Sequence, residues 1–295
     1  MPGLRARLCI ATSIGIVSGA CCWFLLAHFQ QRAADFTWAI QAAQDLLSGL
    51  PVYERPWQMY PLPAALFGFP FIHMNLELAG GLFYGISSGL LAFGLSRDGY
   101  HRLLIFLAFP YWSGMLTVQW LPLVMASAFF PVLLPSTMAK PQIGLPLALT
   151  HMTRKGAIAC ALVLLLSFAL MPHWLTAWLG HLGHYAYFIP LLVLPGPLLL
   201  LALLRFRDKD AWLIVLAACM PQRWFYDAFL LWLVPRTRRA IVFTAGLSWL
   251  PAVWRWYVVP HSESTIGRWI VVACYLPMLV VVLLKSTPGL KQPSS

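Results

Sequence analysis

The chain has 295 residues, of which 60% are hydrophobic and only 10% are charged, and its formal net charge is +11. This composition lies far outside the soluble globular range, so it excludes a soluble single domain. The basic residues gather at the ends of apolar runs, which indicates membrane topology rather than nucleic-acid binding. Because one span uses roughly 20 apolar residues, the sequence predicts an all-α integral membrane protein, a single domain over residues 1–295 with about 10–12 transmembrane helices.

The first predicted span covers residues 8–29 and follows Arg5 and Arg7. Its length favours an uncleaved signal anchor, and we expect the N-terminus in the cytoplasm. The remaining spans are expected within residues 61–285. If they alternate in direction, the most basic segments all reach the cytoplasmic side. These segments are the turns at 154–155, 205–210 and 236–239 and the tail, residues 286–295.

Residues 31–60 form the longest polar interruption, and we predict an outer loop that contains an amphipathic helix. An apolar stripe steps along it by three or four residues, so the helix is expected to lie on the outer membrane surface. Asp35 stands just before the first apolar residue, a position typical of a helix N-cap, whereas Asp45 and Glu54 are expected on solvated faces. The stripe consists of Phe36, Ile40, Ala43, Leu47 and Leu50.

The middle third of the chain is rich in proline although it is otherwise as apolar as a membrane span. Proline removes a backbone donor and breaks helices, so we expect short or interrupted helices there. Broken helices within a bilayer are tolerated where they face protein or a water-filled cavity, and this segment is therefore expected to line one. The prolines are Pro110, Pro122, Pro131, Pro135, Pro141 and Pro146.

Three sequence elements resemble glycosyltransferase family 87 in their order and spacing. The family's Tyr-Pro-Pro is interrupted here by Leu62, and its Gly-Gln pair is Val118-Gln119. The elements are Asp35-Phe36 with Gly49-Leu50-Pro51-Val52-Tyr53 and Tyr60-Pro61-Leu62-Pro63, then Lys140-Pro141-Gln142, and finally Pro221 with Tyr226-Asp227.

The resemblance implies a GT-C-like polytopic helical bundle on the cytoplasmic membrane, with its catalytic loop on the outer side. It implies transfer of a hexose or pentose from a polyprenyl-phosphate donor to a lipid or glycan acceptor, as in mycobacterial mannosyl- and arabinofuranosyltransferases. By the same resemblance Asp35 is the expected general base. The expected substrate-binding residues are Tyr53, Tyr60, Lys140, Gln142, Arg223, Tyr226 and Asp227.

Lys140 is the most informative cation, because it stands among prolines between two apolar runs where an unpaired ammonium group is costly. Its side chain could reach the membrane interface. Alternatively, it could contact the donor phosphate or a structural carboxylate. Arg223 and Asp227 could form an ion pair on an outer turn.

No cofactor is expected from the sequence. His173, His181 and His184 are separated by eight and three residues, but they lie among Trp and Tyr residues without neighbouring acids. An aromatic belt at the membrane interface is therefore expected there rather than a metal site. The sequence also lacks a glycine-rich nucleotide loop, so a soluble nucleotide-sugar donor is not expected.

Two other classes of protein compete with a glycosyltransferase. A polytopic transporter or lipid flippase would also use broken helices and buried charge, but transporters usually show matching interruptions in two halves. Here the prolines crowd one region and the acidic loop occurs once. A noncatalytic membrane scaffold is the third alternative, in which Lys140 and the acids of the first loop have no chemical role.

Overall fold

The computed structural model describes residues 3–30, 34–54, 59–182, 187–257 and 263–285. These residues are mostly helical and form no β-strand; one isolated bridge joins Phe188 to Gln222. The prediction of an all-α protein is confirmed for this part of the chain. The predicted tail at 286–295 and His184 lie outside the described residues.

Three helical segments in the described residues are long and apolar enough to cross a membrane. They are α1 (Leu4–His28), α4 (Leu76–Leu95) and the segment Thr265–Leu283, which joins α14 (Glu263–Ile270) to α15 (Leu276–Leu283) through a π-helical turn. A fourth passes the same test only if α9 (Arg154–Leu170) and α10 (Trp174–His181), bent by 93°, form one span. A membrane protein is supported, and the count of 10–12 spans stays a prediction.

The proline-rich middle third is built from short helices, as predicted. Three of its prolines, Pro110, Pro122 and Pro141, stand in the first turn of a helix, where the missing backbone donor costs nothing. Pro146 lies inside a helix. The helices are α5 (Phe109–Met115), α6 (Leu121–Ala126), α7 (Ser136–Ala139) and α8 (Pro141–His151), with 3-10 turns at Tyr100–Leu107 and Pro131–Leu133.

The predicted amphipathic helix exists as α2 (Ala34–Leu47), but it does not lie on the surface. Phe36, Trp38 and Ile40 are all buried, and so is Asp45, which was expected to be solvated. Leu47 of the predicted apolar stripe is exposed. The prediction was wrong here because residues on both sides of the stripe are also apolar, so the helix can be enclosed by the protein around it.

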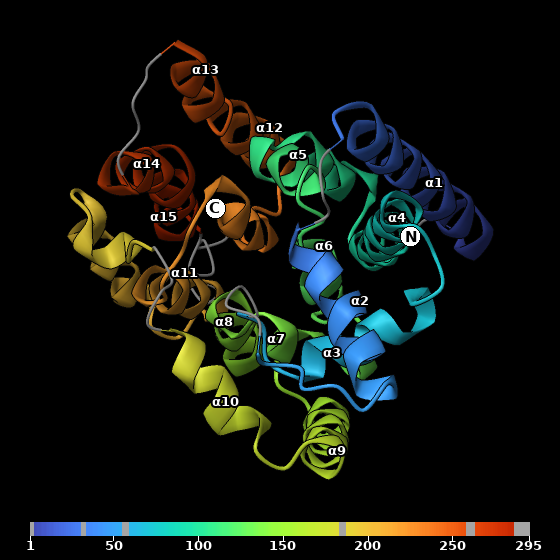
Figure 1. Ribbon diagram of the computed structural model, residues 1–295. Coiled ribbons are helices and arrows are strands. Elements are labelled where there is room, and N and C mark those ends of the chain that lie inside the picture. The colour runs from blue at the N-terminus through green and yellow to red at the C-terminus, as the bar shows by residue number, and fades with distance from the viewer. Residues whose placement is uncertain (1–2, 31–33, 55–58, 183–186, 258–262, 286–295) are drawn as a thin grey trace, which may run out of the picture.

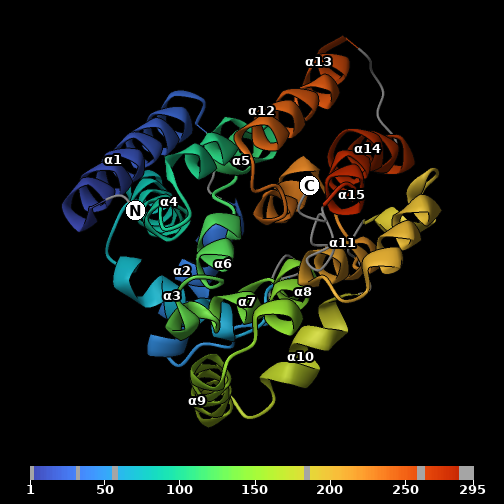
Figure 2. The ribbon, with the colours of Figure 1, turned by 180° about the vertical axis from the view of Figure 1, so that it is seen from behind.

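The segment after Pro61 does not open a second span, as had been expected. It forms α3 (Pro63–Gly68) and a 3-10 turn (Phe69–Phe71), which are too short to cross a membrane. The next spanning candidate is α4, which packs along α1 in both views of the molecule (Figures 1 and 2). The segment between the first two spanning candidates, α1 and α4, is therefore longer than predicted, and α2 and α3 pack together within it.

The rest of the chain is built mainly from further short helices. Several charged residues from the turns between them lie in contact. Lys285 Nζ lies 2.8 Å from Asp208 Oδ2 and 2.5 Å from Asp210 Oδ2, and Arg236 lies 3.6 Å from the same Asp210 oxygen. Two of the basic turns that were predicted to share one side of the membrane, 205–210 and 236–239, thus meet near Lys285. The elements are Pro190–Leu192, Gly196–Arg205, α11 (Lys209–Cys219), Phe225–Leu233, α12 (Arg238–Leu247) and α13 (Leu250–Tyr257).

These contacts also change the acidity of Asp208. Burial alone raises the pKa of its carboxyl group, but hydrogen bonds from Lys285 and from the Asp210 amide, with the charges of Lys285 and Arg236, lower it overall below the ordinary value. The carboxylate therefore stays ionised, and the charged face holds the end of α15 against the turn before α11.

Candidate functional site

Lys140 is the centre of a buried polar network between α7 and α8. Its side chain is 2% exposed, and its ammonium Nζ lies 3.0 Å from Asp227 Oδ1 and 3.5 Å from Asp35 Oδ2. It also donates a hydrogen bond of 2.5 Å to Gln119 Oε1. Snorkelling to the interface is therefore wrong for Lys140. Of the alternatives considered, the structure shows contact with carboxylates.

Gln119 joins the two ends of this network. Its amide nitrogen donates to Asp35 Oδ2 and, over 2.9 Å, to Thr117 Oγ1, while its oxygen accepts from Lys140. Its own side chain is placed by an unusual backbone, because Val118 before it has φ +48°. That region favours glycine and is rare for a β-branched residue. The turn at Val118 thus directs Gln119 into the protein interior between Asp35 and Lys140.

Asp35 lies in the first turn of α2 rather than at the N-cap position that was one interpretation of it. Its carboxylate is 15% exposed, so it is accessible on one side while Lys140 and Gln119 hold the other. A negative charge in the first turn is also favoured by the helix dipole. These contacts fix the orientation of the carboxylate, which is the first requirement for a general base.

Asp227 has a different environment, since its side chain is fully enclosed. One oxygen contacts Lys140, and the other accepts a hydrogen bond of 2.9 Å from the backbone N–H of Arg223. This contact is made by the main chain of Arg223, and the ion pair between the two side chains stays a prediction. The ring of Tyr226 lies under the ammonium group of Lys140, 4.6 Å from Nζ to the ring centre, in a cation–π contact.

A cavity of about 650 Å³ adjoins this network. Five residues expected to be functional line it, and they come from four separated parts of the chain: Asp35, Tyr60, Gln142, Arg223 and Tyr226. Its other lining residues are Thr37, Trp38, Gln41, Met59, Pro61, Ala139, Pro141, Trp178, Leu182, Met220 and Pro221.

Three of the predicted site residues do not reach this cavity. Lys140 and Asp227 lie behind its wall, and Tyr53 supports the wall by donating a hydrogen bond of 3.0 Å to the carbonyl oxygen of Tyr60. Burial raises the pKa of the Tyr53 hydroxyl above its ordinary value, so it stays protonated and serves as a donor. These three residues therefore position others.

The aromatic walls of the cavity were not predicted from the sequence. The rings of Trp38 and Tyr60 stack with centres 5.6 Å apart, and Trp178 Nε1 donates to the carbonyl oxygen of Met59 over 2.9 Å. Trp38 sits on the helix that carries Asp35, and this proximity in sequence was the available signal for it. Trp178 had been assigned only to an aromatic belt.

The remaining candidates are placed less centrally. Glu54 is exposed, as expected of a solvated acid, and His181 lies beside Tyr53 with ring centres 5.9 Å apart. Within the described residues there is no group of three or more His, Cys, Asp or Glu side chains that could hold a metal ion.

Taken together, the described lining of the cavity contains one carboxylate, Asp35, and one permanent cation, Arg223. Aromatic and apolar side chains form most of the remainder. A concave, largely apolar site with a few oriented polar groups is typical of small-molecule binding. Such a site can accept a hydroxyl proton at Asp35 and can hold an anion at Arg223.

Comparison with known proteins finds no matching family model, no similar characterised protein and no similar solved structure.

Proposed function

We propose that this protein is a membrane glycosyltransferase that transfers a sugar from a polyprenyl-phosphate donor to a lipid or glycan hydroxyl on the outer face of the cytoplasmic membrane. The observation that carries the proposal is Asp35, a carboxylate that opens onto the cavity and is oriented by Lys140 and Gln119. The resemblance to glycosyltransferase family 87 adds support, since Asp35 is the residue to which it assigns the base.

In the proposed reaction the acceptor hydroxyl oxygen forms a bond to the anomeric carbon of the sugar. The bond between that carbon and the phosphate oxygen breaks, and the phosphate leaves with the electron pair. The hydroxyl proton passes to Asp35, which acts as general base. Lys140 and Asp227 do not touch the substrate; they are positioning residues that hold this carboxylate in place.

Arg223 supplies the positive charge that the leaving phosphate requires. It lines the same cavity as Asp35, and its planar guanidinium group suits two hydrogen bonds to phosphate oxygens. A cation aimed at developing negative charge stabilises the transition state. This role had been considered for Lys140, but the ammonium of Lys140 is enclosed between carboxylates, so Arg223 is the better candidate.

The apolar part of the cavity suits the remainder of the donor and acceptor. Trp38, Tyr60 and Trp178 provide flat walls on which a sugar ring can lie, and Met220 and Leu182 provide apolar surface for the first part of a lipid chain. Binding energy from these remote groups can hold the anomeric carbon near Asp35.

The experiment compares wild type with Asp35→Asn in nanodiscs, using radiolabelled polyprenyl-phosphate mannose and arabinofuranose with extracted membrane lipids and glycans as acceptors. We expect label to move into a new product with wild type. Asparagine keeps the shape but cannot accept the proton, so turnover should fall by about 10² to 10⁴. Donor binding, measured in parallel, should be retained. Glu54→Gln is the control, since Glu54 is an exposed acid of the same loop.

Retention of more than about a tenth of wild-type turnover by Asp35→Asn, against the expected loss, would remove Asp35 from the catalytic role. If no label is transferred but labelled lipid moves across proteoliposome membranes, the protein is a flippase or transporter instead.

A further inference from the structure

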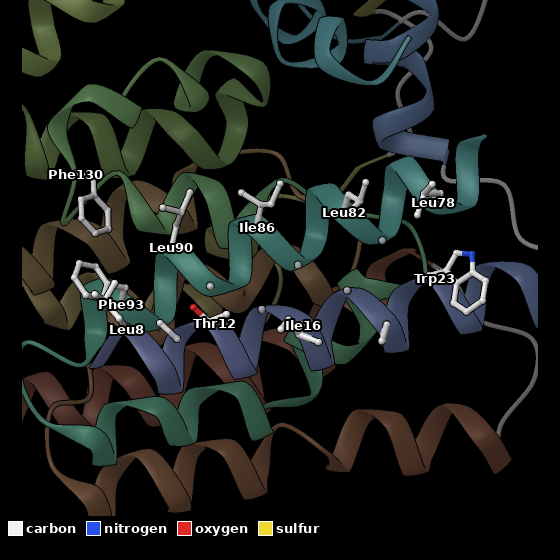
Figure 3. Close-up of a pocket in the computed structure, with 17 residues that line it drawn as sticks. Leu8, Thr12, Ile16, Trp23, Leu78, Leu82, Ile86, Leu90, Phe93 and Phe130 are labelled. Atoms are coloured by element: carbon white, nitrogen blue, oxygen red, sulfur yellow. The ribbon is translucent and has the colours of Figure 1, made fainter. Parts of the chain in front are cut away.

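An apolar groove of about 790 Å³ runs along the contact between α1 and α4, away from the Asp35 site. Its walls are rows of side chains spaced by four residues, Leu78, Leu82, Ile86 and Leu90 on one helix and Leu8, Thr12 and Ile16 on the other (Figure 3). Apart from Thr12, the side chains that line it are aliphatic or aromatic, or absent because the residue is glycine.

The floor of the groove is made by close contact between the two backbones. A Cβ atom added at Gly85 would lie 2.7 Å from the carbonyl oxygen of Gly15, and one added at Gly19 would lie 2.9 Å from that of Gly81. Glycine is therefore required for the helices to approach this closely. Because the glycines along the contact have no side chains, they form the floor of the groove, and the two rows of larger residues form its walls.

The length of the groove matches the depth of one membrane leaflet. From Leu78 to Leu90 the α4 wall extends over twelve residues, or roughly 18 Å at the helical rise. One leaflet contributes about 15 Å of hydrocarbon. Both helices are long and apolar enough to cross a membrane, so in the bilayer this groove opens to lipid rather than to water.

Two arginines stand at one end of the groove, each over one ring of a pair of stacked phenylalanines. Arg7 lies 4.5 Å from the ring centre of Phe93, and Arg97 lies 4.9 Å from that of Phe130. The rings of Phe93 and Phe130, which line the groove, stack with centres 6.1 Å apart. Each ring of the stacked pair therefore carries one guanidinium group at this end of the groove.

Within the described residues, the side chains of these two arginines contact uncharged groups. In the part of the chain that the structure describes, neither Arg7 nor Arg97 forms a salt bridge. Arg7 donates to Ser96 Oγ and the carbonyl oxygen of Phe93, and Arg97 donates to the carbonyl oxygen of Phe129. Each guanidinium has five N–H donors, so these contacts leave donors for an anion.

We propose that the groove binds one acyl chain of an anionic phospholipid, whose headgroup phosphate is held by Arg7 and Arg97. Charge complementarity selects the headgroup, and the apolar groove of leaflet length takes the chain. A zwitterionic lipid would fill the groove equally well, but its cationic group would oppose the arginine pair. The site is separate from the Asp35 cavity, so the proposal stands independently of the proposed reaction.

The test measures binding of phosphatidylglycerol and phosphatidylcholine with identical acyl chains to delipidated protein in detergent, by native mass spectrometry. We expect phosphatidylglycerol to bind wild type about tenfold more tightly than phosphatidylcholine does. Arg7→Gln and Arg97→Gln should each remove most of this preference. Arg7→Lys, which keeps the charge, should retain most of it. Arg268→Gln is the control, because Arg268 lies on α14, across the molecule from α1 and α4 (Figures 1 and 2).

A second pair of variants separates the groove from the arginines. Thr12→Phe fills the groove and should weaken binding of both lipids, whereas Ser13→Phe places the same side chain on the neighbouring exposed position outside it and should weaken neither. Size-exclusion profiles confirm that each variant is folded. Equal binding of the two lipids to wild type, or unchanged binding by Thr12→Phe, would overturn the proposal. So would a dimer that Thr12→Phe dissociates, since the occupant would then be a second copy of the chain.

Discussion

The ammonium group of Lys140 is a buried charge, which is costly unless it is paired. Its two carboxylate partners differ in their exposure to the cavity. Asp227 is fully enclosed and 3.0 Å away, whereas Asp35 is 3.5 Å away and opens to the cavity. Removing one member of a buried ion pair leaves an uncompensated charge in an apolar medium. Stability should therefore depend more on the pair with Asp227, while the proposed reaction depends on Asp35.

We predict that Lys140→Met lowers the stability of the protein by about 3–5 kcal/mol. Adding Asp227→Asn to it should recover most of that loss, because asparagine removes the unpaired charge and can still accept from the Arg223 amide. Adding Asp35→Asn should recover less, since that carboxylate can reach water in the cavity. Thermal midpoints in detergent for the two double-mutant cycles measure this. Equal recovery by both would contradict the assignment of Asp227 as the structural partner.

Val118 carries a second testable feature at the residue scale. Its φ of +48° is disfavoured for any side chain with a Cβ atom and most of all for a branched one. Val118→Gly relieves this strain, and Val118→Ala does not, although both variants lose buried methyl groups. We expect the glycine variant to be more stable than the alanine variant by about 1 kcal/mol. Elsewhere in a protein, an alanine variant is usually more stable than the corresponding glycine variant. A more stable alanine variant would show that residue 118 does not adopt this backbone conformation.

At the scale of elements, the contact between α1 and α4 depends on a surface without side chains. Gly85→Ala places a Cβ 2.7 Å from the carbonyl oxygen of Gly15 and 3.0 Å from the Gly19 Cα, both on backbone that cannot rotate away. The helices must separate, and packing along the whole contact is lost.

We therefore predict that Gly85→Ala lowers stability by about 1–3 kcal/mol, the usual range for overpacking. Gly246→Ala is the matched control, because a Cβ added there meets nothing within 4 Å and Gly246 also lies inside a helix. It should raise stability by up to about 1 kcal/mol through helix propensity. The two thermal midpoints should move in opposite directions; a shift in the same direction would mean that the backbones are further apart than described.

Among the elements, the starts of the short helices could be predicted from the prolines, but the environment of α2 could not be predicted from its sequence. The prolines of the middle third determine where helices begin, and the structure begins three of them there. Helix α2 was predicted from a stripe at helical spacing, and the helix is present. Its environment could not be predicted, because the same stripe fits a membrane surface or a protein interior. Asp45, which was expected on a solvated face of this helix, is buried.

At the scale of the whole molecule, the meeting of Arg236, Asp208, Asp210 and Lys285 places several charged turns on one face. Arg102 and His101 join the same face through the carbonyl oxygens of Pro235 and Arg236. This face matches the side that the distribution of basic residues assigns to the cytoplasm.

We predict that Ser48→Cys and Thr237→Cys, in a cysteine-free background, are labelled from opposite sides of the membrane by an impermeant reagent. Both residues are exposed, and they lie on the first loop and on the charged face respectively. Thr237→Cys should react only after permeabilisation of the cells. Labelling of both from one side would contradict the topology and would remove Asp35 from the outer surface.

The sequence by itself determined the class of structure and many of the residues at the site. Its apolar composition requires helices in a membrane, because only internal hydrogen bonding satisfies the backbone there. Lys140 stood out as a charged residue in apolar surroundings, where such a group is costly unless it has a partner. Asp35 and Asp227 were predicted from the resemblance to glycosyltransferase family 87.

Only the tertiary structure decided which of those residues pair with one another and which line the cavity. Pairing of Lys140 with two carboxylates, the bridging of Gln119 and the assignment of Arg223 to the cavity depend on contacts between segments about 20 to 190 residues apart in the sequence. The sequence shows that a buried charge needs a partner but not which partner reaches it. The distances between side chains follow from packing of the short helices, and no local pattern encodes them.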